Sequence, residues 1–229
     1  MTGSPAPARF APAPQPSFRL IPSQFPPIGL FDTVATPADL EAAMELAGWT
    51  NDRLVVERLR RLPLDQWVHG RANSSVVMAS FLHAAPRGQR FSGPDLGAWY
   101  AAGDIRTAAA EVGHHLRREA LARRVPAMAR TYRCYSATLA GTDYRDIRGE
   151  EAIRPELYRP DDYSASQLFG EAVRKAGQAG ILYDSVRRRG GGNVVAYRPG
   201  QVGAVTQTDH FRISVQPVER RIVVQRLTR

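Results

Sequence analysis

Downstream of Trp67, short apolar runs alternate with Gly- and Pro-containing turns, and this pattern is typical of β-strands. The runs predict strands over residues 76–78, 98–101, 132–139, 181–183, 194–197 and 222–224. Two other segments carry apolar residues at helical spacing behind a capping residue, and they predict helices over residues 104–124 and 164–176. The glycine run at residues 190–192 lies between two predicted strands and indicates a hairpin turn. These elements predict one mixed α+β domain over residues 67–229, of about 160 residues, which is long enough to bury a core.

The N-terminal part of the chain differs in composition from the part after Trp67. Its first 27 residues contain eight prolines, so they cannot hold a helix and they favour an extended backbone. Three phenylalanines could hold this segment on a folded surface, but the pattern favours a loose Pro-rich arm over residues 1–35. Residues 36–39 form a capping signal, and the apolar residues after them recur at helical spacing. Residues 36–66 therefore predict a helical extension ahead of the main domain.

Composition narrows the class of protein. The 229 residues carry a net charge of +9, almost entirely from arginine, because Lys175 is the only lysine. The single cysteine, Cys134, excludes an intrachain disulfide, and no apolar run is long enough to span a membrane, so we expect a cytoplasmic protein. The start of the chain has no apolar core of a signal peptide. A pI near 10.4 permits binding to nucleic acid, but the arginines are scattered, and an acidic protein or an anionic ligand explains the charge equally well.

Familiar catalytic motifs are missing from the sequence. It contains no phosphate-binding P-loop, no dinucleotide-binding glycine fingerprint after a strand, and no nucleophile elbow. Glu111 and His115 lie one helical turn apart, a spacing that could hold a metal ion, but no third ligand is obvious. We therefore predict no metal site and no prosthetic group.

Several separate segments, taken in order, resemble one family. They are residues 89–102 (QRFSGPDLGAWYAA), 107–111 (TAAAE), 166–167 (SQ), 180–187 (GILYDSVR) and 191–195 (GGNVV). Their order and spacing resemble the RES domain family, named for an arginine, a glutamate and a serine, and the resemblance covers roughly residues 67–200. It implies an ADP-ribosyltransferase-like fold, a split mixed β-sheet with flanking helices and an NAD-binding cleft.

The resemblance also implies a function. RES proteins are toxins of bacterial type II toxin–antitoxin systems, and many degrade NAD⁺ at the nicotinamide–ribose bond by phosphorolysis or hydrolysis. NAD⁺ would then be the substrate, with inorganic phosphate as an optional co-substrate. The implied partner is an Xre-type antitoxin, and nucleic acid would be contacted only through that antitoxin. The resemblance leaves open whether the chain forms a homodimer within a hetero-oligomer. Two alternatives are transfer of ADP-ribose to a protein target and a non-catalytic basic module that binds proteins or nucleic acid.

The family's functional residues map onto this sequence by motif. The resemblance implies Arg71, Glu111 and Ser185 as the catalytic arginine, glutamate and serine. It implies a binding set of Arg71, Arg90, Ser92, Tyr100, Ser185 and Asn193. Their chemistry suits these roles, because a guanidinium can hold a pyrophosphate in a bidentate manner and a fixed carboxylate can stabilise an oxocarbenium-like ribose. Ser185 is expected to bind rather than to attack, since no histidine base is placed for it by sequence.

Overall fold

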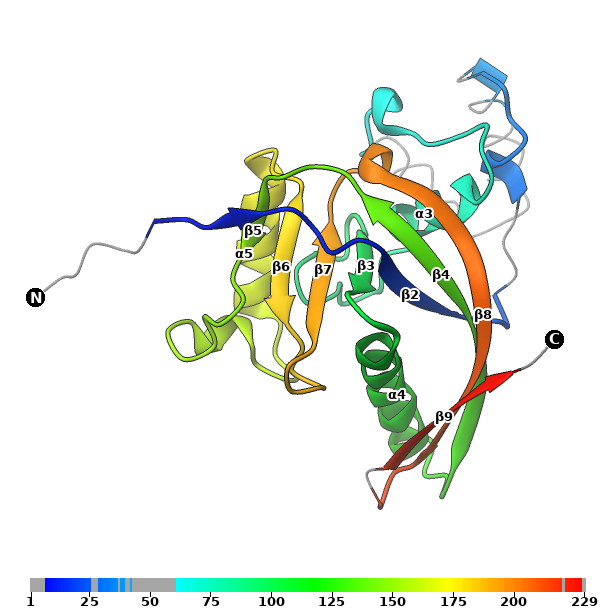
Figure 1. The fold of residues 1–229 in the computed structure, drawn as a ribbon, viewed down its shortest axis with the longest axis vertical. Coiled ribbons are helices and arrows are strands. Elements are labelled where there is room, and N and C mark those ends of the chain that lie inside the picture. Colours follow the sequence, from blue (N-terminus) through cyan, green and yellow to red (C-terminus); the bar gives the residue numbers. More distant parts are fainter. Residues whose placement is uncertain are drawn as a thin grey trace, which may run out of the picture.

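The protein folds around one mixed β-sheet (Figure 1). The computed structural model describes residues 7–25, 29–36, 38–39, 42, 61–219 and 221–227. Within them the strand order is β1-β5-β6-β7-β3-β2-β4-β8-β9, and every neighbouring pair is antiparallel except β5 and β6. The strands are β1 (Phe10–Ala11), β2 (Ser17–Pro22), β3 (Trp99–Ala102), β4 (Met128–Leu139), β5 (Tyr144–Asp146), β6 (Gly180–Asp184), β7 (Gly192–Ala196), β8 (Val202–Gln216) and β9 (Arg221–Leu227).

Three α-helices and four short 3₁₀ helices complete the described part. The α-helices are α3 (Ser74–Leu82), α4 (Ile105–Ala122) and α5 (Ser164–Lys175). The 3₁₀ helices are η1 (Gly29–Phe31), η2 (Leu64–Gln66), η3 (Pro155–Leu157) and η4 (Pro199–Gln201). The expectation of an α+β fold with helices flanking a mixed sheet is confirmed.

The sheet is divided near its middle, between β2 and β3. These two strands pair at one position only, Phe18 opposite Ala102. By contrast, β2 pairs with β4 along its whole length, and β3 pairs with β7 along its whole length. The weakly paired line between β2 and β3, here called the seam, joins a half made of β1, β5, β6, β7 and β3 to a half made of β2, β4, β8 and β9.

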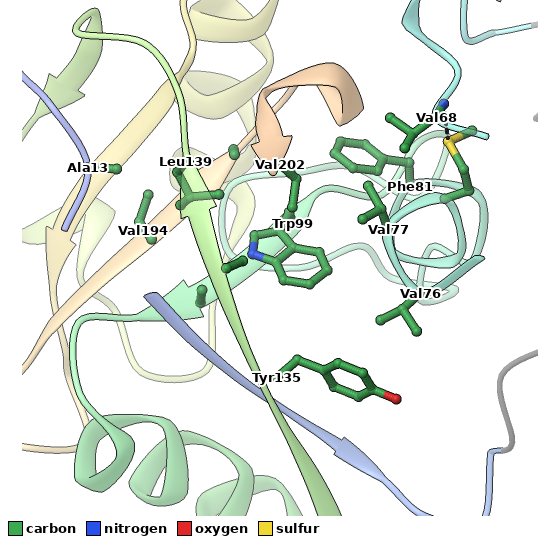
Figure 2. Packing of buried hydrophobic residues seen from close by; sticks show 14 of the residues in the cluster. Ala13, Val68, Val76, Val77, Phe81, Trp99, Tyr135, Leu139, Val194 and Val202 are labelled. Carbon is green, nitrogen blue, oxygen red and sulfur yellow. Dashed lines mark hydrogen bonds between the residues drawn. The ribbon is translucent and has the colours of Figure 1, made fainter. Parts of the chain in front are cut away.

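One face of the sheet is covered by α3. Figure 2 shows Val76, Val77 and Phe81 of this helix near Trp99 of β3 and Val202, within one cluster of buried apolar side chains. Burying a side chain of this size stabilises the fold by about 1.5–3 kcal/mol. The indole nitrogen of Trp99 is buried without a hydrogen-bond partner in the structure.

The opposite face is covered by α4 and α5. Side chains alternate along a strand, so Tyr100 and Ala102 point away from the α3 cluster that contains Trp99. Ala102 packs in the α4 cluster, whereas Tyr100 packs against the α5 cluster. The two helices therefore stand over different halves of the sheet, with the seam between them.

Two predictions for the N-terminal half are wrong. Residues 76–78 form the middle of α3 and not a strand; almost all of α3 is buried, so the helix shows no polar stripe that would reveal its period. Residues 17–22 form β2 inside the sheet and not part of a loose arm, and Pro22 is tolerated because it ends the strand. Strand β1 pairs with β5 at the far edge, so the N-terminal segment runs from the edge to the centre (Figure 1). Most of the helical extension predicted over residues 36–66 lies outside the described residues.

The other predicted elements are confirmed with small shifts in their ends. The predicted helices correspond to α4 and α5, and the predicted strands after residue 97 correspond to β3, β4, β6, β7 and β9. The glycine run lies in the turn of the β6–β7 hairpin. Strands β5 and β8 were not predicted.

Candidate active site

A cavity of about 780 Å³ opens at the seam, on the face covered by α4 and α5. Strands β2 and β3 form its floor, with contributions from β6 and β7. Helix α4 and the segments 87–90 and 161–164 form its walls. The cavity therefore lies where the two halves of the sheet stop pairing and leave space for a ligand.

Glu111 lines this pocket from α4, and two donors fix its carboxylate. The Ser185 hydroxyl and the Asn193 side-chain amide each donate a hydrogen bond of 2.7 Å to the same oxygen, Oε1. Both donors are largely buried, at 9% and 4% exposure, so the hydrogen bonds are shielded from competing water. Asp104 caps the start of α4 by accepting from the Thr107 backbone N–H at 2.9 Å, and this sets the helix that carries Glu111.

Ser185 has its hydroxyl fully engaged. The hydroxyl donates to Glu111 and accepts from the backbone N–H groups of Arg187 and Arg188, both at 3.1 Å. A serine nucleophile needs a base that takes its proton, and here the proton points to a carboxylate that is itself held in place. The geometry thus agrees with a binding or positioning role for this serine.

Arg19, on β2, brings a cation to the pocket. Its Nη1 donates to the Tyr100 carbonyl oxygen at 3.0 Å, and its guanidinium lies 5.0 Å from the centre of the Trp99 ring. Burial lowers the pKa of Arg19 to about 10, so the group stays charged at neutral pH. No carboxylate in the described residues forms an ion pair with it, which leaves its charge available to an anionic ligand.

Arg71 does not reach this pocket. It lies just before α3, and its Nη2 donates to the Val202 carbonyl oxygen at 2.9 Å. Because α3 covers the opposite face of the sheet, the assignment of the family arginine to Arg71 is not supported by the structure. Sequence reasoning missed Arg19; its position inside the apolar run Phe18-Arg19-Leu20-Ile21 is the signal that could have found it.

Arg90 and Tyr100 lie at the pocket as predicted, but their polar groups already have partners. Arg90 donates from Nη1 to the carbonyl oxygens of Leu157 at 3.1 Å and Arg159 at 2.9 Å, and its guanidinium lies 4.7 Å from the Tyr163 ring centre. It therefore anchors the wall of the pocket that carries Tyr163.

The Tyr100 hydroxyl makes two hydrogen bonds, both with residues of the segment before β3. It accepts from the Phe91 N–H at 2.9 Å and shares a 3.0 Å hydrogen bond with the Ser92 hydroxyl. Burial raises the pKa of Tyr100 to about 12, so the ring is uncharged at neutral pH. Ser92 is buried behind Tyr100 and does not line the cavity, so it supports the ring instead of contacting a ligand.

The family model of the RES domain matches residues 58–216, more than two thirds of the chain. The chain belongs to the RES domain family. This RES-domain chain is 28% identical over 200 residues to the uncharacterized protein y4oC of Sinorhizobium fredii, covering 85% of this chain and 80% of that protein.

One solved structure is also similar to this RES-domain chain. It is the crystal structure of the M. tuberculosis MbcT–MbcA toxin–antitoxin complex. The match has a TM-score of 0.46 and 16% identity, and it covers 92% of this chain and 89% of that chain.

The RES domain holds two adjacent histidines on α4 near the pocket. His115 lines the cavity one turn after Glu111, and its ring centre lies 5.6 Å from that of His114. Burial and nearby arginines lower the pKa of His114 to about 4, and burial lowers the pKa of His115, so both imidazoles are neutral at pH 7. Within the described residues no group of three or more His, Cys, Asp or Glu side chains could hold a metal ion, and no helix is long and apolar enough to cross a membrane.

Proposed function

We propose that this RES domain binds NAD⁺ in the pocket at the seam and cleaves the bond between nicotinamide and ribose. The observation that carries the proposal is Glu111, held through Oε1 by Ser185 and Asn193 in a pocket that also contains the unpaired charge of Arg19. NAD⁺ is a ligand that needs both features. It has a pyrophosphate for a guanidinium to bind, and its cleavage develops positive charge on the ribose, which a fixed carboxylate stabilises.

The reaction balances without a redox partner. The C1′–N bond breaks, and its electron pair leaves with nicotinamide, which thereby loses its positive charge. An oxygen of the acceptor forms the new bond to C1′. With water as acceptor the products are ADP-ribose and one proton, and with inorganic phosphate the product is ADP-ribose 1″-phosphate.

Each pocket residue has a defined part in this proposal. Glu111 faces the developing charge on the ribose or orients its hydroxyls. Arg19 binds the pyrophosphate, and Tyr100 offers an aromatic ring to the nicotinamide. Ser185 and Asn193 keep the Glu111 carboxylate in one orientation, since a carboxylate held by two donors does not have to reorganise during the reaction.

We further propose that the cellular role is that of a toxin, neutralised by an antitoxin of the Xre type. Membership in the RES domain family supports this role, because the resemblance to RES proteins implies a toxin of a toxin–antitoxin system. The net charge of +9 would suit an acidic binding surface on such a partner. Expression of the chain alone should then lower cellular NAD⁺ and arrest growth, whereas expression of Glu111→Gln should do neither.

The test is incubation of the purified protein with NAD⁺, with and without inorganic phosphate, while nicotinamide and the ADP-ribose product are followed. We expect nicotinamide release that Glu111→Gln lowers by about 100- to 1000-fold with the fold intact. Glu151→Gln, an exposed change of the same charge, is the matched control and should keep the wild-type rate. Full activity of Glu111→Gln would overturn the role of Glu111.

Other outcomes identify the alternatives. Release that depends on phosphate identifies phosphorolysis, and release without phosphate identifies hydrolysis. Label from NAD⁺ that appears on a protein identifies ADP-ribosyl transfer. Absence of any turnover, together with strongly salt-dependent binding to DNA or RNA, would overturn the proposal in favour of a binding module.

A further inference from the structure

We infer that Arg188 is a positioning residue for Glu111, because it clamps the β6–β7 turn onto the start of α4. The turn supplies Ser185, and the helix supplies Glu111, so a clamp between them sets the 2.7 Å hydrogen bond that joins the two side chains. The kinetic part of this inference rests on the proposed function, whereas its structural part does not.

The turn closes around the Ser185 hydroxyl. The Ser185 N–H donates to the Gly191 carbonyl oxygen at 2.8 Å, and the Gly191 N–H donates to the Arg188 carbonyl oxygen at 3.0 Å. The N–H groups of Arg187 and Arg188 both donate to the Ser185 hydroxyl oxygen. The orientation of that hydroxyl therefore depends on the conformation of the whole turn.

The Arg188 side chain ties this turn to α4. Its Nη1 donates to Asp104 Oδ2 at 3.1 Å and to Thr107 Oγ1 at 2.8 Å. Asp104 is the capping residue of α4, and Thr107 lies in its first turn, where the two side chains share a 2.6 Å hydrogen bond. One guanidinium nitrogen thus holds the turn and the helix start together.

The β6–β7 turn and the start of α4 are in direct contact, so a movement of one displaces the other. A Cβ atom at Gly191 would lie 2.5 Å from Thr107 Oγ1, so the turn and the helix touch with no room for a side chain between them. Glu111 follows Thr107 by one helical turn and lies on the same side of α4. A shift of the clamp would therefore change the separation of Glu111 and Ser185.

The clamp contributes little to overall stability. The side chains of Arg188 and Asp104 are 34% and 44% exposed, and ion pairs with such exposure contribute little to the free energy of unfolding. Loss of Arg188 should therefore alter turnover while the fold and the thermal midpoint stay close to those of the wild type.

The experiment compares Arg188→Gln with Arg189→Gln. Arg189 is the exposed neighbour in the same turn, so its replacement removes the same charge and leaves the clamp in place. We expect Arg188→Gln to lower kcat for nicotinamide release by about 10- to 100-fold with KM little changed. Arg188→Lys should recover part of the loss, and Arg189→Gln should match the wild type. Equal kcat in Arg188→Gln and Arg189→Gln would overturn the kinetic part.

A second pair of measurements separates a positional effect from a change in charge. In a Thr107→Val background, one of the two acceptors of Arg188 is already gone. Arg188→Gln should therefore lower kcat by a smaller factor in this background than in the wild type. A pure charge effect would lower kcat by the same factor in both backgrounds, and this result would count against the clamp.

Amide hydrogen exchange reports the clamp without any turnover. The N–H groups of Arg187 and of residue 188 should exchange faster in Arg188→Gln than in Arg189→Gln, because their acceptor loses its fixed position. Unchanged exchange would overturn the structural part. If the wild-type protein releases no nicotinamide, the proposed function fails, and the exchange comparison still decides whether the clamp exists.

Discussion

The Arg19 guanidinium crosses the seam and donates to the Tyr100 carbonyl oxygen at 3.0 Å. Strands β2 and β3 are paired only at Phe18 and Ala102, so beyond this point a side chain takes the place of the backbone ladder. The same arrangement fixes a positive charge at the floor of the pocket. The divided sheet and the anion-binding capacity of the site thus have one structural origin.

Replacement of Arg19 should weaken binding of anionic ligands. We expect Arg19→Gln to bind ADP-ribose about 10- to 100-fold more weakly, since hydrogen bonds to charged groups contribute about 1.5–3 kcal/mol each. Arg71→Gln is the control, because this guanidinium lies before α3 on the other face and should leave binding unchanged. Isothermal titration calorimetry with ADP-ribose measures both. Weaker binding in Arg71→Gln but not in Arg19→Gln would restore the original arginine assignment.

Asn193 should matter through Glu111. In Asn193→Ala the Oε1 atom of Glu111 keeps only the Ser185 donor, and we expect nicotinamide release to fall by about tenfold. Asn193→Asp, which has nearly the same shape, places a second carboxylate against the first, so one of the two should take up a proton more readily. The activity of this variant should be lowest at high pH and should rise as the pH falls. A pH–rate profile that matches the wild type would contradict this arrangement.

Much of the fold can be predicted from local patterns, and the exceptions have physical causes. Helix α4 was found because it has a cap and a clear apolar stripe. Helix α3 was mistaken for a strand because its buried surroundings remove the polar stripe. Strand β8 was not predicted because only four of its fifteen positions are buried and several are polar. Strand β2 was hidden by prolines that in fact lie outside the strand or at its end.

The grouping of candidate residues at the pocket was predictable where they follow a family motif. Glu111, Ser185 and Asn193 were named from motifs, and the structure brings them together although Ser185 and Asn193 follow Glu111 by 74 and 82 residues. Arg71 was named from the family motif alone, and the structure places it before α3 and outside the lining of the cavity. Arg19 was missed because the choice between a loose arm and a central strand depends on pairing with β4, more than 100 residues later in the chain. Long-range pairing of this kind leaves only the short apolar run around Arg19 as a local signal.

The packing of α5 against the segment before β3 predicts a stability effect. A Cβ atom at Gly170 would lie 2.0 Å from the Phe91 carbonyl oxygen and 2.7 Å from the Tyr197 hydroxyl. Gly170→Ala should therefore lower the free energy of unfolding by about 1–3 kcal/mol or more. At Gly200 an added Cβ meets nothing within 4 Å, so Gly200→Ala should be neutral or slightly stabilising. Urea denaturation of both variants measures the difference, and equal midpoints would contradict the close contact.

The His114 imidazole predicts a pH dependence of stability. Its Nε2 is buried without a hydrogen-bond partner in the structure, and burial lowers its pKa to about 4. The unfolded chain binds a proton at His114 below about pH 6.5, whereas the folded protein does so only near pH 4. The free energy of unfolding should consequently decrease as the pH falls through this interval. His114→Gln should show a shallower decrease in urea titrations, and an unchanged slope would place the pH dependence elsewhere.

The central position of β2 has a consequence for the order of events during synthesis. Arg19 leaves the ribosome well before its neighbours in the sheet and the residues that hold Glu111, and Asn193 lies 174 residues further along the chain. At a translation rate of about 5–20 residues per second, Arg19 and Asn193 emerge roughly 9 to 35 s apart. A nascent chain that has not yet released Asn193 therefore carries no complete pocket, and the activity we propose begins only after this residue has emerged and folded.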